Sequence, residues 1–505
     1  MRRDAHARNT MSTTSPEAER VWHRLSPRML LVHPVHEVLR QIPLLVGAVV
    51  LGSATGNSWW TVAAVAVTIG FGVLRWFTTT YRIEPDEVQL RTGVLQRKVV
   101  SVPRNRIRSV ATDARLLHQL LGLTVLRVST GQQATGDAEF ALDAVRAEEV
   151  PRLRSILLAD SLTPAAETTE QQPRGVQLAR WQPSWLRYSP LSFTGLAMIA
   201  AAMGVIYQAG VGAALEHSDI AESGRDAAQR FGVIASIAVV LAAVVLASVL
   251  LSVVRSLLTY GNLSLRRDVD VLHLEHGLLR KREHTFDMRR LRGGTLRSPL
   301  LVRVLGGARL DAVMTGVAGA GEASILLPPC PVRTAESVLA ELISDVNAVA
   351  GPVRGHGPAA ARRRWTRGLA PPVVLAGGLA VTSAVVAVPV WVWFAVAVFA
   401  LCCALLAADR VRALGHRVDE RWLVARAGSL ERRRDCIAAE GIIGWTVRQS
   451  FFQRRAGVAT LIAATAAGTK HYQVIDVPAE LSWSIAGAAS PWVADSEWAL
   501  PQQAV

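Results

Sequence analysis

The sequence has few of the features that mark secreted, metal-binding or catalytic proteins. Its four cysteines, Cys330, Cys402, Cys403 and Cys436, show no paired spacing, so they predict neither a disulfide framework nor a zinc site. The first twenty residues hold no apolar stretch of the kind that forms a signal peptide, so nothing indicates cleavage and export. Gly-x-Ser-x-Gly, His-Glu-x-x-His and a complete phosphate-binding loop are all missing. We therefore expect no enzymatic activity, no catalytic residue, no metal site and no cofactor.

Acidic residues are also in the minority. Lys and Arg together number 55 against 40 for Asp and Glu, yet half of the residues are apolar and the mean hydropathy is +0.27. A soluble protein this basic is ordinarily polar and binds nucleic acid, whereas an apolar chain with basic segments suits a bilayer with anionic headgroups. Most tryptophans, such as Trp59 and Trp391, sit in or beside apolar runs, as interfacial belt residues do. The composition favours a membrane protein with no nucleic-acid partner.

Three regions are long and apolar enough to cross a bilayer twice, since one helical crossing needs about 20 apolar residues. The first runs from Glu37 to Phe77 and breaks at residues 52–58. The second comprises residues 192–214 and 231–258, and the third runs from Leu369 to Ala408 with Pro389 at its turn. Six transmembrane helices in three hairpins are expected. The alternative is a set of buried core helices in a soluble protein, but charge-free runs of this length are rare outside membranes.

The cations are distributed unevenly along the chain. The loops inside the three hairpins carry almost none, with only Arg225 and Arg230 in the longest, whereas the tail and the segments after each hairpin are rich in Arg. By the positive-inside rule, both termini and all soluble segments are predicted to be cytoplasmic, in a multi-pass protein of the cell membrane. The spans have essentially no ionisable residues at mid-membrane, which argues against transport by this chain alone.

The soluble segments repeat one unit three times. With Gly93, Gly277 and Gly428 in register, a second shared glycine follows after the same interval in each copy, which indicates one supersecondary unit per repeat. The other aligned positions are the glycines Gly122, Gly306 and Gly457, the basic residues Arg82, Arg266 and Arg417, and the acidic residues Glu84, Asp268 and Asp419.

Each copy has the pattern of a small β-rich domain. Apolar and polar residues alternate around the first glycine, which predicts two strands that turn there. An amphipathic helix closes the first two copies, at roughly residues 144–158 and 334–349, and the third ends with a weaker candidate after Pro478. The further strands are expected at residues 123–129, 309–313 and 459–463, and at residues 139–142, 323–327 and 472–475. A small antiparallel β-barrel or sandwich closed by a C-terminal helix is the predicted architecture.

Several motifs of the repeat resemble the bacterial PH-like domain. They are the Tyr81-Arg-Ile-Glu84 strand, the Val94-Leu-Gln-Arg97 and Leu278-Leu-Arg-Lys281 stretches after the glycine turn, the Arg104-Asn-Arg-Ile107 stretch, and the Leu-Leu hook that begins at Leu116. The whole chain from Val38 to about Val477 is similar to the YdbT-like membrane proteins, with the third copy the most divergent. The resemblance implies a pleckstrin-homology-type fold, and fold alone does not settle function. Some relatives are linked to tolerance of antimicrobial peptides.

Arginine clusters are the candidate binding residues. A guanidinium group offers a planar fork of donors that matches phosphate oxygens, and each cation near an anionic leaflet contributes about 1 kcal/mol. The alternative is a purely topological role, in which these cations stay on the cytoplasmic side of the spans and on solvated strand faces. The candidate contacts to anionic lipid or to a protein partner are Arg104, Arg106, Arg108, Arg280, Lys281, Arg282, Arg289, Arg290, Arg432, Arg433 and Arg434.

The sequence thus predicts a non-enzymatic, membrane-anchored scaffold that presents three cytoplasmic PH-like domains at the inner leaflet. Its expected partners are the lipid bilayer, anionic lipid headgroups and another membrane protein of the same family. The alternative is a membrane subunit of an export or antimicrobial-peptide-resistance system whose chemistry resides in a partner chain. The expected segments are a basic disordered tail (1–36), hairpin 1 (37–77), domain 1 (78–160), a linker (161–190), hairpin 2 (191–258), domain 2 (259–350), a basic linker (351–368), hairpin 3 (369–408), domain 3 (409–490) and a C-terminal tail (491–505).

Overall fold

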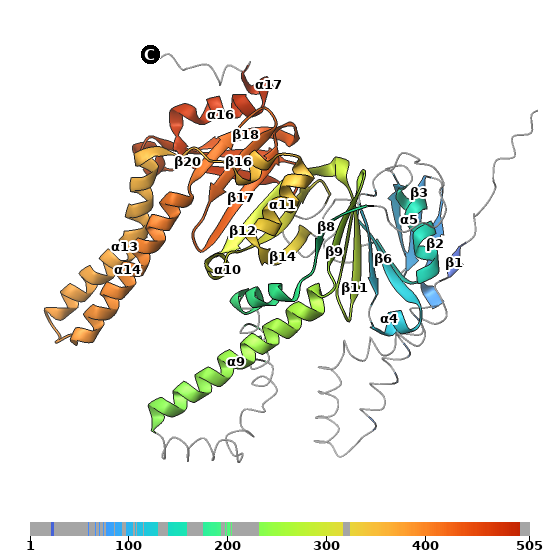
Figure 1. Ribbon diagram of the computed structural model, residues 1–505, viewed down its shortest axis with the longest axis horizontal. Coiled ribbons are helices and arrows are strands. Elements are labelled where there is room, and N and C mark those ends of the chain that lie inside the picture. The colour runs from blue at the N-terminus through green and yellow to red at the C-terminus, as the bar shows by residue number, and fades with distance from the viewer. Residues whose placement is uncertain are drawn as a thin grey trace, which may run out of the picture. The chain divides into compact units, whose positions relative to one another are not determined.

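A computed structural model describes residues 22–24, most of 77–129, 140–158, 175–192, 232–316 and 324–494, with isolated residues between 59 and 74 and between 197 and 204. The chain divides into two compact units, residues 1–167 and residues 168–505. The first unit contains one copy of the repeat, which we name module 1, and the second contains modules 2 and 3 (Figure 1). Most of hairpin 1 and the first helix of hairpin 2 lie outside the described residues.

Module 1 consists of two antiparallel meanders and a closing helix. β1 (His23–Arg24) pairs with β2, which extends the first meander at its edge. The first meander contains β2 (Thr80–Ile83), β3 (Glu87–Thr92) and β4 (Lys98–Pro103). The second contains β5 (Ser109–Ala114), the short helix α4 (Leu116–Leu120), β6 (Leu123–Ser129) and β7 (Phe140–Arg146), and the closing helix is α5 (Val150–Leu158). The closing helix therefore begins several residues after the predicted start at residue 144, because β7 continues to Arg146.

Module 2 repeats this plan, including the short edge strand. β8 (Val176–Arg180) pairs with the first strand of the module. The meanders contain β9 (Ser264–Asp268), β10 (Val271–His276) and β11 (Lys281–Asp287), then β12 (Leu291–Pro299), α10 (Leu300–Val304), β13 (Gly307–Met314) and β14 (Ile325–Pro331). The predicted closing helix is present as two pieces, α11 (Val332–Ile343) and α12 (Val346–Ala350), because Ser344 between them takes the left-handed conformation, with φ of 54°.

Module 3 has the same order of elements, so the third copy keeps the fold although its sequence diverges. Its closing helix, predicted after Pro478, begins at Ser482. The elements are β15 (Gly415–Val418), β16 (Trp422–Ala427), β17 (Glu431–Ala438), β18 (Ile442–Arg448), α15 (Phe451–Arg455), β19 (Val458–Thr465), β20 (His471–Pro478), α16 (Ser482–Ala489) and α17 (Pro491–Ala494).

The second shared glycine occupies the same structural position in all three modules. Gly122, Gly306 and Gly457 each follow the short helix of the second meander, with φ of 66°, 72° and 66°. Each glycine carbonyl also accepts a hydrogen bond from the residue after the meander's last strand, from Ala147, Val332 and Ala479 at 2.9–3.0 Å. Because L-residues rarely adopt this conformation, the repeated glycine is explained by backbone geometry. The predicted repeat register is confirmed.

Modules 2 and 3 share one sheet. Strand β12 pairs with β13 on one side and with β17 on the other, which gives a six-stranded sheet in the order β14-β13-β12-β17-β16-β15 (Figure 1). Alternate side chains of β17 enter different cores: Cys436 packs in the core of module 2 and Ile437 in the core of module 3. A strand that is apolar on both faces needs a layer on each side. The sequence left open whether the modules pack together, and the β12–β17 pairing shows that modules 2 and 3 do.

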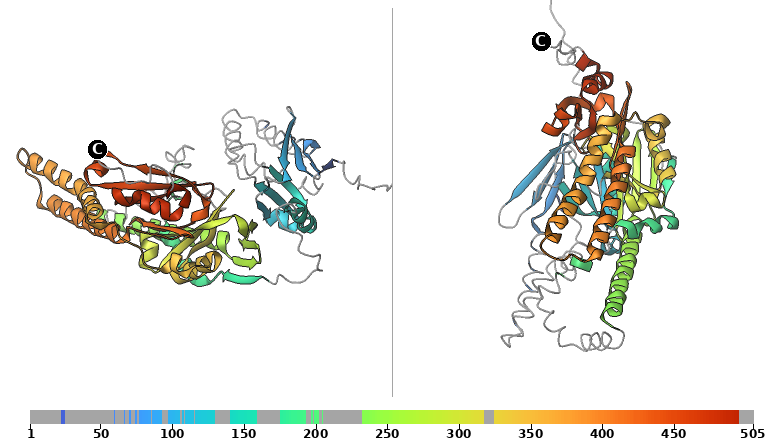
Figure 2. Two further views of the ribbon diagram at one scale, coloured as in Figure 1. Left: turned by 90° about the horizontal axis from the view of Figure 1, so that it is seen from above. Right: turned by 90° about the vertical axis from the view of Figure 1, so that its left-hand side faces the viewer.

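The described part of the second unit contains three long helices: α9 (Val233–Tyr260), α13 (Gly357–Ser383) and α14 (Val390–Ala413). Helices α13 and α14 pack side by side as a hairpin that projects from the sheets, and Pro389 lies at its turn as predicted (Figure 2). Helix α13 begins at Gly357, inside the segment expected to be a linker, so the basic stretch and the apolar stretch form one continuous helix.

The helices test three of the six predicted spans. Among the described residues, α9 and α14 are long and apolar enough to cross a membrane, and only 6% of the most apolar window of each is buried. Such exposure contradicts the alternative of buried core helices in a soluble protein. Helix α13 does not meet the same criterion, because its apolar part, from Leu369 to Ser383, would span only about 22 Å. The remaining predicted spans lie largely outside the described residues.

Candidate functional site

The cluster of Arg280, Lys281 and Arg282 lies at the β10–β11 turn, beside the end of α9. The backbone N–H of Gly277 donates to the carbonyl of Gly261, and that of Leu278 donates to the carbonyl of Leu258, so the β10–β11 turn is held against the last turn of this apolar helix. Leu278 and Leu279 are exposed at the tip of the turn. Arg280, Lys281 and Arg282 follow directly, and Lys281 forms an ion pair with Glu275 at 2.6 Å. Exposed leucines next to cations suit a membrane–water interface.

The cluster on β17 is used inside the protein. Arg434 donates to the carbonyls of Ala348 and Gly351 at 3.1 and 2.7 Å, which fastens α12 to the sheet. Arg433 pairs with the buried Asp435 at 3.2 Å. Arg432 reaches Asp409 of α14, and Arg303 of α10 reaches the same carboxylate at 2.8 Å. Asp409 thereby joins the apolar helix α14 to both modules. Arg432, Arg433 and Arg434 each contact a different part of the protein.

The remaining candidate arginines are scattered. Arg289 and Arg290 both pair with Asp287, at 3.2 and 3.4 Å. Arg104 donates to the carbonyl of Ile156 and so ties the first meander of module 1 to its closing helix. Arg106 and Arg108 lie outside the described residues. Among the described candidates of the second unit, the arginines on β17 and at Asp287 are each engaged by different partners within the protein.

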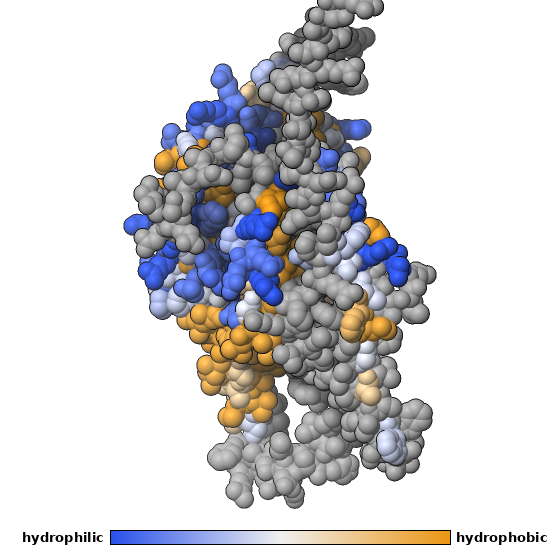
Figure 3. All heavy atoms as spheres, turned by 90° about the vertical axis from the view of Figure 1, so that its right-hand side faces the viewer, coloured by the Kyte–Doolittle hydropathy of each residue, from blue (hydrophilic) through white to orange (hydrophobic). Residues whose placement is uncertain are grey.

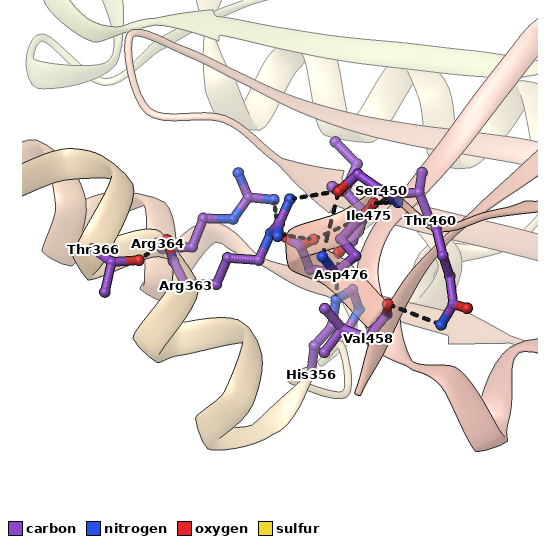
Figure 4. A network of polar contacts seen from close by, with 11 residues as sticks. His356, Arg363, Arg364, Thr366, Ser450, Val458, Thr460, Ile475 and Asp476 are labelled. Carbon is purple, nitrogen blue, oxygen red and sulfur yellow. Dashed lines mark hydrogen bonds and ion pairs between the residues drawn. The ribbon is translucent and has the colours of Figure 1, made fainter. Parts of the chain in front are cut away.

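A buried anion network lies where α13 meets module 3 (Figure 4). Asp476 on β20 is fully buried, with its Oδ1 3.1 Å from Nε of Arg363 and its Oδ2 2.9 Å from a terminal nitrogen of Arg364. Gln453 of α15 donates to the same carboxylate at 2.9 Å and to Thr460 at 2.8 Å. One aspartate therefore holds α13 and α15 against the same strand. Burial of the Arg364 guanidinium outweighs the attraction of Asp476 and lowers the pKa of Arg364.

A pair of histidines adjoins this network. Nδ1 of His356 lies 2.8 Å from the carbonyl of Ile475, and its Nε2 lies 2.9 Å from Nδ1 of His416. Since a carbonyl only accepts, Nδ1 of His356 carries the proton; in the neutral ring its Nε2 is then the acceptor and Nδ1 of His416 the donor. Burial lowers the pKa of both, to about 4 for His416. The pair is a neutral structural clasp at the start of α13.

A cavity of about 640 Å³ opens between α13 and α15. Three of its arginines, Arg362, Arg367 and Arg455, are exposed and make no ion pair or side-chain hydrogen bond with other described residues. Its full lining is Ala359, Arg362, Arg363, Thr366, Arg367, Ala370, Phe452, Arg455 and Ala456, which includes no acidic residue. The sequence did not predict this site, because the Arg-rich segments were interpreted there only through the positive-inside rule. The missing information was that α13 is continuous and docks beside α15.

The described residues offer little of the equipment for catalysis. They contain no cluster of three or more His, Cys, Asp or Glu side chains that could hold a metal ion. Burial raises the pKa of the Cys330 and Cys436 thiols to about 12, so these buried cysteines are poor nucleophiles at neutral pH.

Comparison with known proteins agrees with the repeat. Residues 38–161, 226–346 and 373–482 each match the bacterial PH domain, which covers more than half of the chain. The chain belongs to the bacterial PH domain family. Each matched segment contains the two meanders of one module and also apolar sequence before them, which in the second and third segments includes α9 and α14. The prediction drawn from the sequence motifs is confirmed.

One curated relative of the chain is a transmembrane protein. The chain is 32% identical over 95 residues to the transmembrane protein YdbT of Bacillus subtilis, a match that covers 19% of this chain and 18% of YdbT. The match thus spans about a fifth of that relative's length. No solved structure matches the chain. Together with the exposed apolar helices α9 and α14, the membership shows a membrane-associated protein with bacterial PH domains.

Proposed function

We propose that the protein is a non-enzymatic scaffold that crosses the cell membrane several times and presents three cytoplasmic PH-like modules at the inner leaflet. The observation that carries this proposal is the joint at Asp409. Through it, the apolar helix α14 is fastened to α10 of module 2 and to β17 of module 3. Because those modules share a sheet, motion of either is coupled to the helix. Such an arrangement suits a platform held at a fixed height above the bilayer.

The distribution of charge supports the cytoplasmic orientation. Arg362, Arg363, Arg364 and Arg367 precede the apolar half of α13, and Arg410 and Arg412 end α14, while residues 384–389 of the connecting turn carry no charge. In Figure 3, hydrophobic side chains gather toward the helical end of the view and hydrophilic ones over the sheets. By the positive-inside rule the turn of hairpin 3 faces outward. We extend this topology to six spans in three hairpins.

The shared sheet also suggests how a partner joins. In the second unit, β12 is the first strand of the second meander of module 2. It pairs with β17, which is the third strand of the first meander of module 3. The equivalent strand of module 3, β18, pairs only with β19 among the described strands of that unit. Its open edge fits the third strand of a further PH-like module. In a second copy that strand is β4 of module 1, which lies at the edge of its own sheet. Head-to-tail strand addition would then link copies.

Co-purification of two differently tagged copies from nanodiscs tests the partner. We expect the tags to co-purify, and we expect replacement of the exposed Ile443 on β18 by Lys to reduce their association at least five-fold, because a charge on an edge strand opposes pairing. Ile443→Val serves as the control. Equal association of both variants and the wild type would refute the edge contact. A stoichiometric membrane protein of another family would favour the alternative role as a subunit of an export or resistance system.

A further inference from the structure

The cavity between α13 and α15 has an unusual charge balance. Arg362, Arg367 and Arg455 converge on it, and no acidic side chain lines it. Asp476, which pairs with Arg363 of the lining and with Arg364, is fully buried and so is already engaged by those two arginines. Guanidinium groups gathered without a counter-ion create a strong local positive potential. The cavity is therefore suited to an anion that brings several acceptor oxygens.

Both walls of the cavity are fixed in place. The α13 wall is held by the ion pairs of Arg363 and Arg364 with Asp476. The α15 wall begins with a capping box, in which Ser450 and Gln453 bond to each other's backbone N–H groups, and Gln453 also donates to Asp476. An anion entering the cavity meets arginines on a preformed frame, which lowers the ordering cost of binding.

The position of the cavity along α13 points to a lipid. Arg367 is the last charged residue of the helix, and the charge-free stretch begins at Gly368. Phe452 on the opposite wall is 69% exposed, beside the equally exposed Phe451. The cavity lining thus combines these cations with apolar side chains, namely Phe452 of α15 and Ala370 from the charge-free part of α13. Basic pockets at the cytoplasmic end of membrane helices have this form when they bind lipid headgroups.

We propose that this cavity binds the phosphate of an anionic phospholipid, with Arg362, Arg367 and Arg455 around the phosphate oxygens and Phe452 against the first part of an acyl chain. The inference deepens the proposed membrane function and rests on it, since it needs hairpin 3 in the bilayer. It assigns a site different from the arginine clusters predicted from the sequence. A bound lipid would also bridge α13 and α15 from the solvent side, opposite Asp476.

Native mass spectrometry tests the site. The full chain is placed in nanodiscs of phosphatidylcholine and phosphatidylglycerol in equal amounts, and the lipids that stay bound on release are counted. We expect the wild type to retain phosphatidylglycerol in preference to phosphatidylcholine. The triple variant Arg362→Gln/Arg367→Gln/Arg455→Gln should lose at least ten-fold of that retention, and it should fold normally because these side chains have no partners among the described residues. Arg454→Gln is the matched control, since Arg454 is the exposed neighbour of Arg455 outside the cavity lining.

Two further measurements distinguish a failure of the lipid assignment from a failure of the proposed membrane function. If millimolar glycerol phosphate in solution removes the bound phosphatidylglycerol, the site takes soluble phosphate esters and the lipid assignment is overturned. Equal retention by the wild type and the triple variant also overturns it. Labelling with a membrane-impermeant maleimide reports the hairpin separately: Cys402 on α14 is exposed on the protein surface and should be protected by lipid. A reactive Cys402 would mean that the proposed membrane function itself is wrong.

Discussion

Thr295 of module 2 donates a hydrogen bond to Asp435 of module 3 at 2.9 Å, across the strand pair that joins the two modules. Asp311 lies on the other side of Thr295 in the same row, and Arg309, Arg297 and Arg433 form the next row of the same face. Arg297 and Arg309 pair with Asp311 at 2.7 and 2.9 Å. The joint between the modules thus contains one acidic row beside one basic row. Burial raises the pKa of Asp435, while Arg433 and Thr295 oppose that shift.

Loss of the Thr295 hydroxyl should weaken the joint. Thr295→Val keeps the shape of the side chain but removes a hydrogen bond to a buried carboxylate, so we expect the free energy of unfolding to fall by about 2 kcal/mol. Denaturant unfolding of the chain in nanodiscs measures this. Thr446→Val, at an exposed site on β18, should change it by less than about 0.5 kcal/mol. Equal effects at both sites would mean that the joint carries no special stability.

Asp476→Asn should loosen α13 from module 3. The substitution keeps the hydrogen-bonding shape, and asparagine tolerates the left-handed backbone found here, with φ of 57°. Two arginines then lose their buried counter-charge, at a cost of about 3 kcal/mol or more. Hydrogen exchange should show faster opening at the start of α13. Asp419→Asn, which breaks a partly exposed pair with Arg417, should cost less than about 1 kcal/mol and leave α13 protected.

The histidine clasp predicts a dependence of stability on pH. Burial and the neighbouring His356 lower the pKa of His416 from 6.5 to about 4 in the folded protein. Between those values the unfolded chain binds more protons than the folded one, so folding stability is full above pH 6.5 and falls as the pH drops toward 4. The free energy of unfolding would fall by about 3 kcal/mol over this pH range.

His416→Asn tests this directly, because the amide can still donate toward His356 but does not titrate in this range. The variant's Tm should fall less than that of the wild type when the pH is lowered from 7 to 5. His471→Asn, at an exposed histidine, should follow the wild type. A pH profile that His416→Asn leaves unaltered would rule out the clasp as its source.

The repeated glycines predict matched effects in separate modules. Gly306 and Gly457 have φ of 72° and 66°, and an added Cβ would meet no atom within 4 Å at either position. Alanine should therefore destabilise only through backbone strain, by about 1 kcal/mol at each site. Thermal unfolding of Gly306→Ala and Gly457→Ala measures this. Markedly unequal losses would mean that the two turns are not equivalent.

The parts of the fold that repeat locally could be predicted from the sequence. Glycine positions, strand alternation and the short hooks depend on neighbours within a few residues, and the first strand after Gly122 was predicted with its observed bounds, Leu123–Ser129. The pairing of β12 with β17 could not be predicted, because their register partners Thr295 and Asp435 are 140 residues apart in sequence. Nothing in either strand alone names its partner.

The candidate site was harder to predict for a similar reason. A cluster such as Arg432 to Arg434 is prominent in the sequence, but strand geometry turns its members to opposite faces, where each meets a separate partner. The arginines of the cavity come instead from two helices far apart in the chain. Only the docking of α13 through Asp476 brings Arg367 and Arg455 to one place. Charge density along the chain is therefore a poor guide to charge density in space.

The side of the membrane on which module 3 lies is the most direct test of the scaffold proposal. In a chain with Cys402 and Cys403 replaced by alanine, the remaining native cysteines are buried, so Arg454→Cys supplies one exposed thiol on α15. An impermeant maleimide should label this thiol in inverted membrane vesicles and leave it unlabelled in intact cells. Labelling of intact cells, or recovery of the chain outside the membrane fraction, would contradict a membrane-anchored cytoplasmic scaffold.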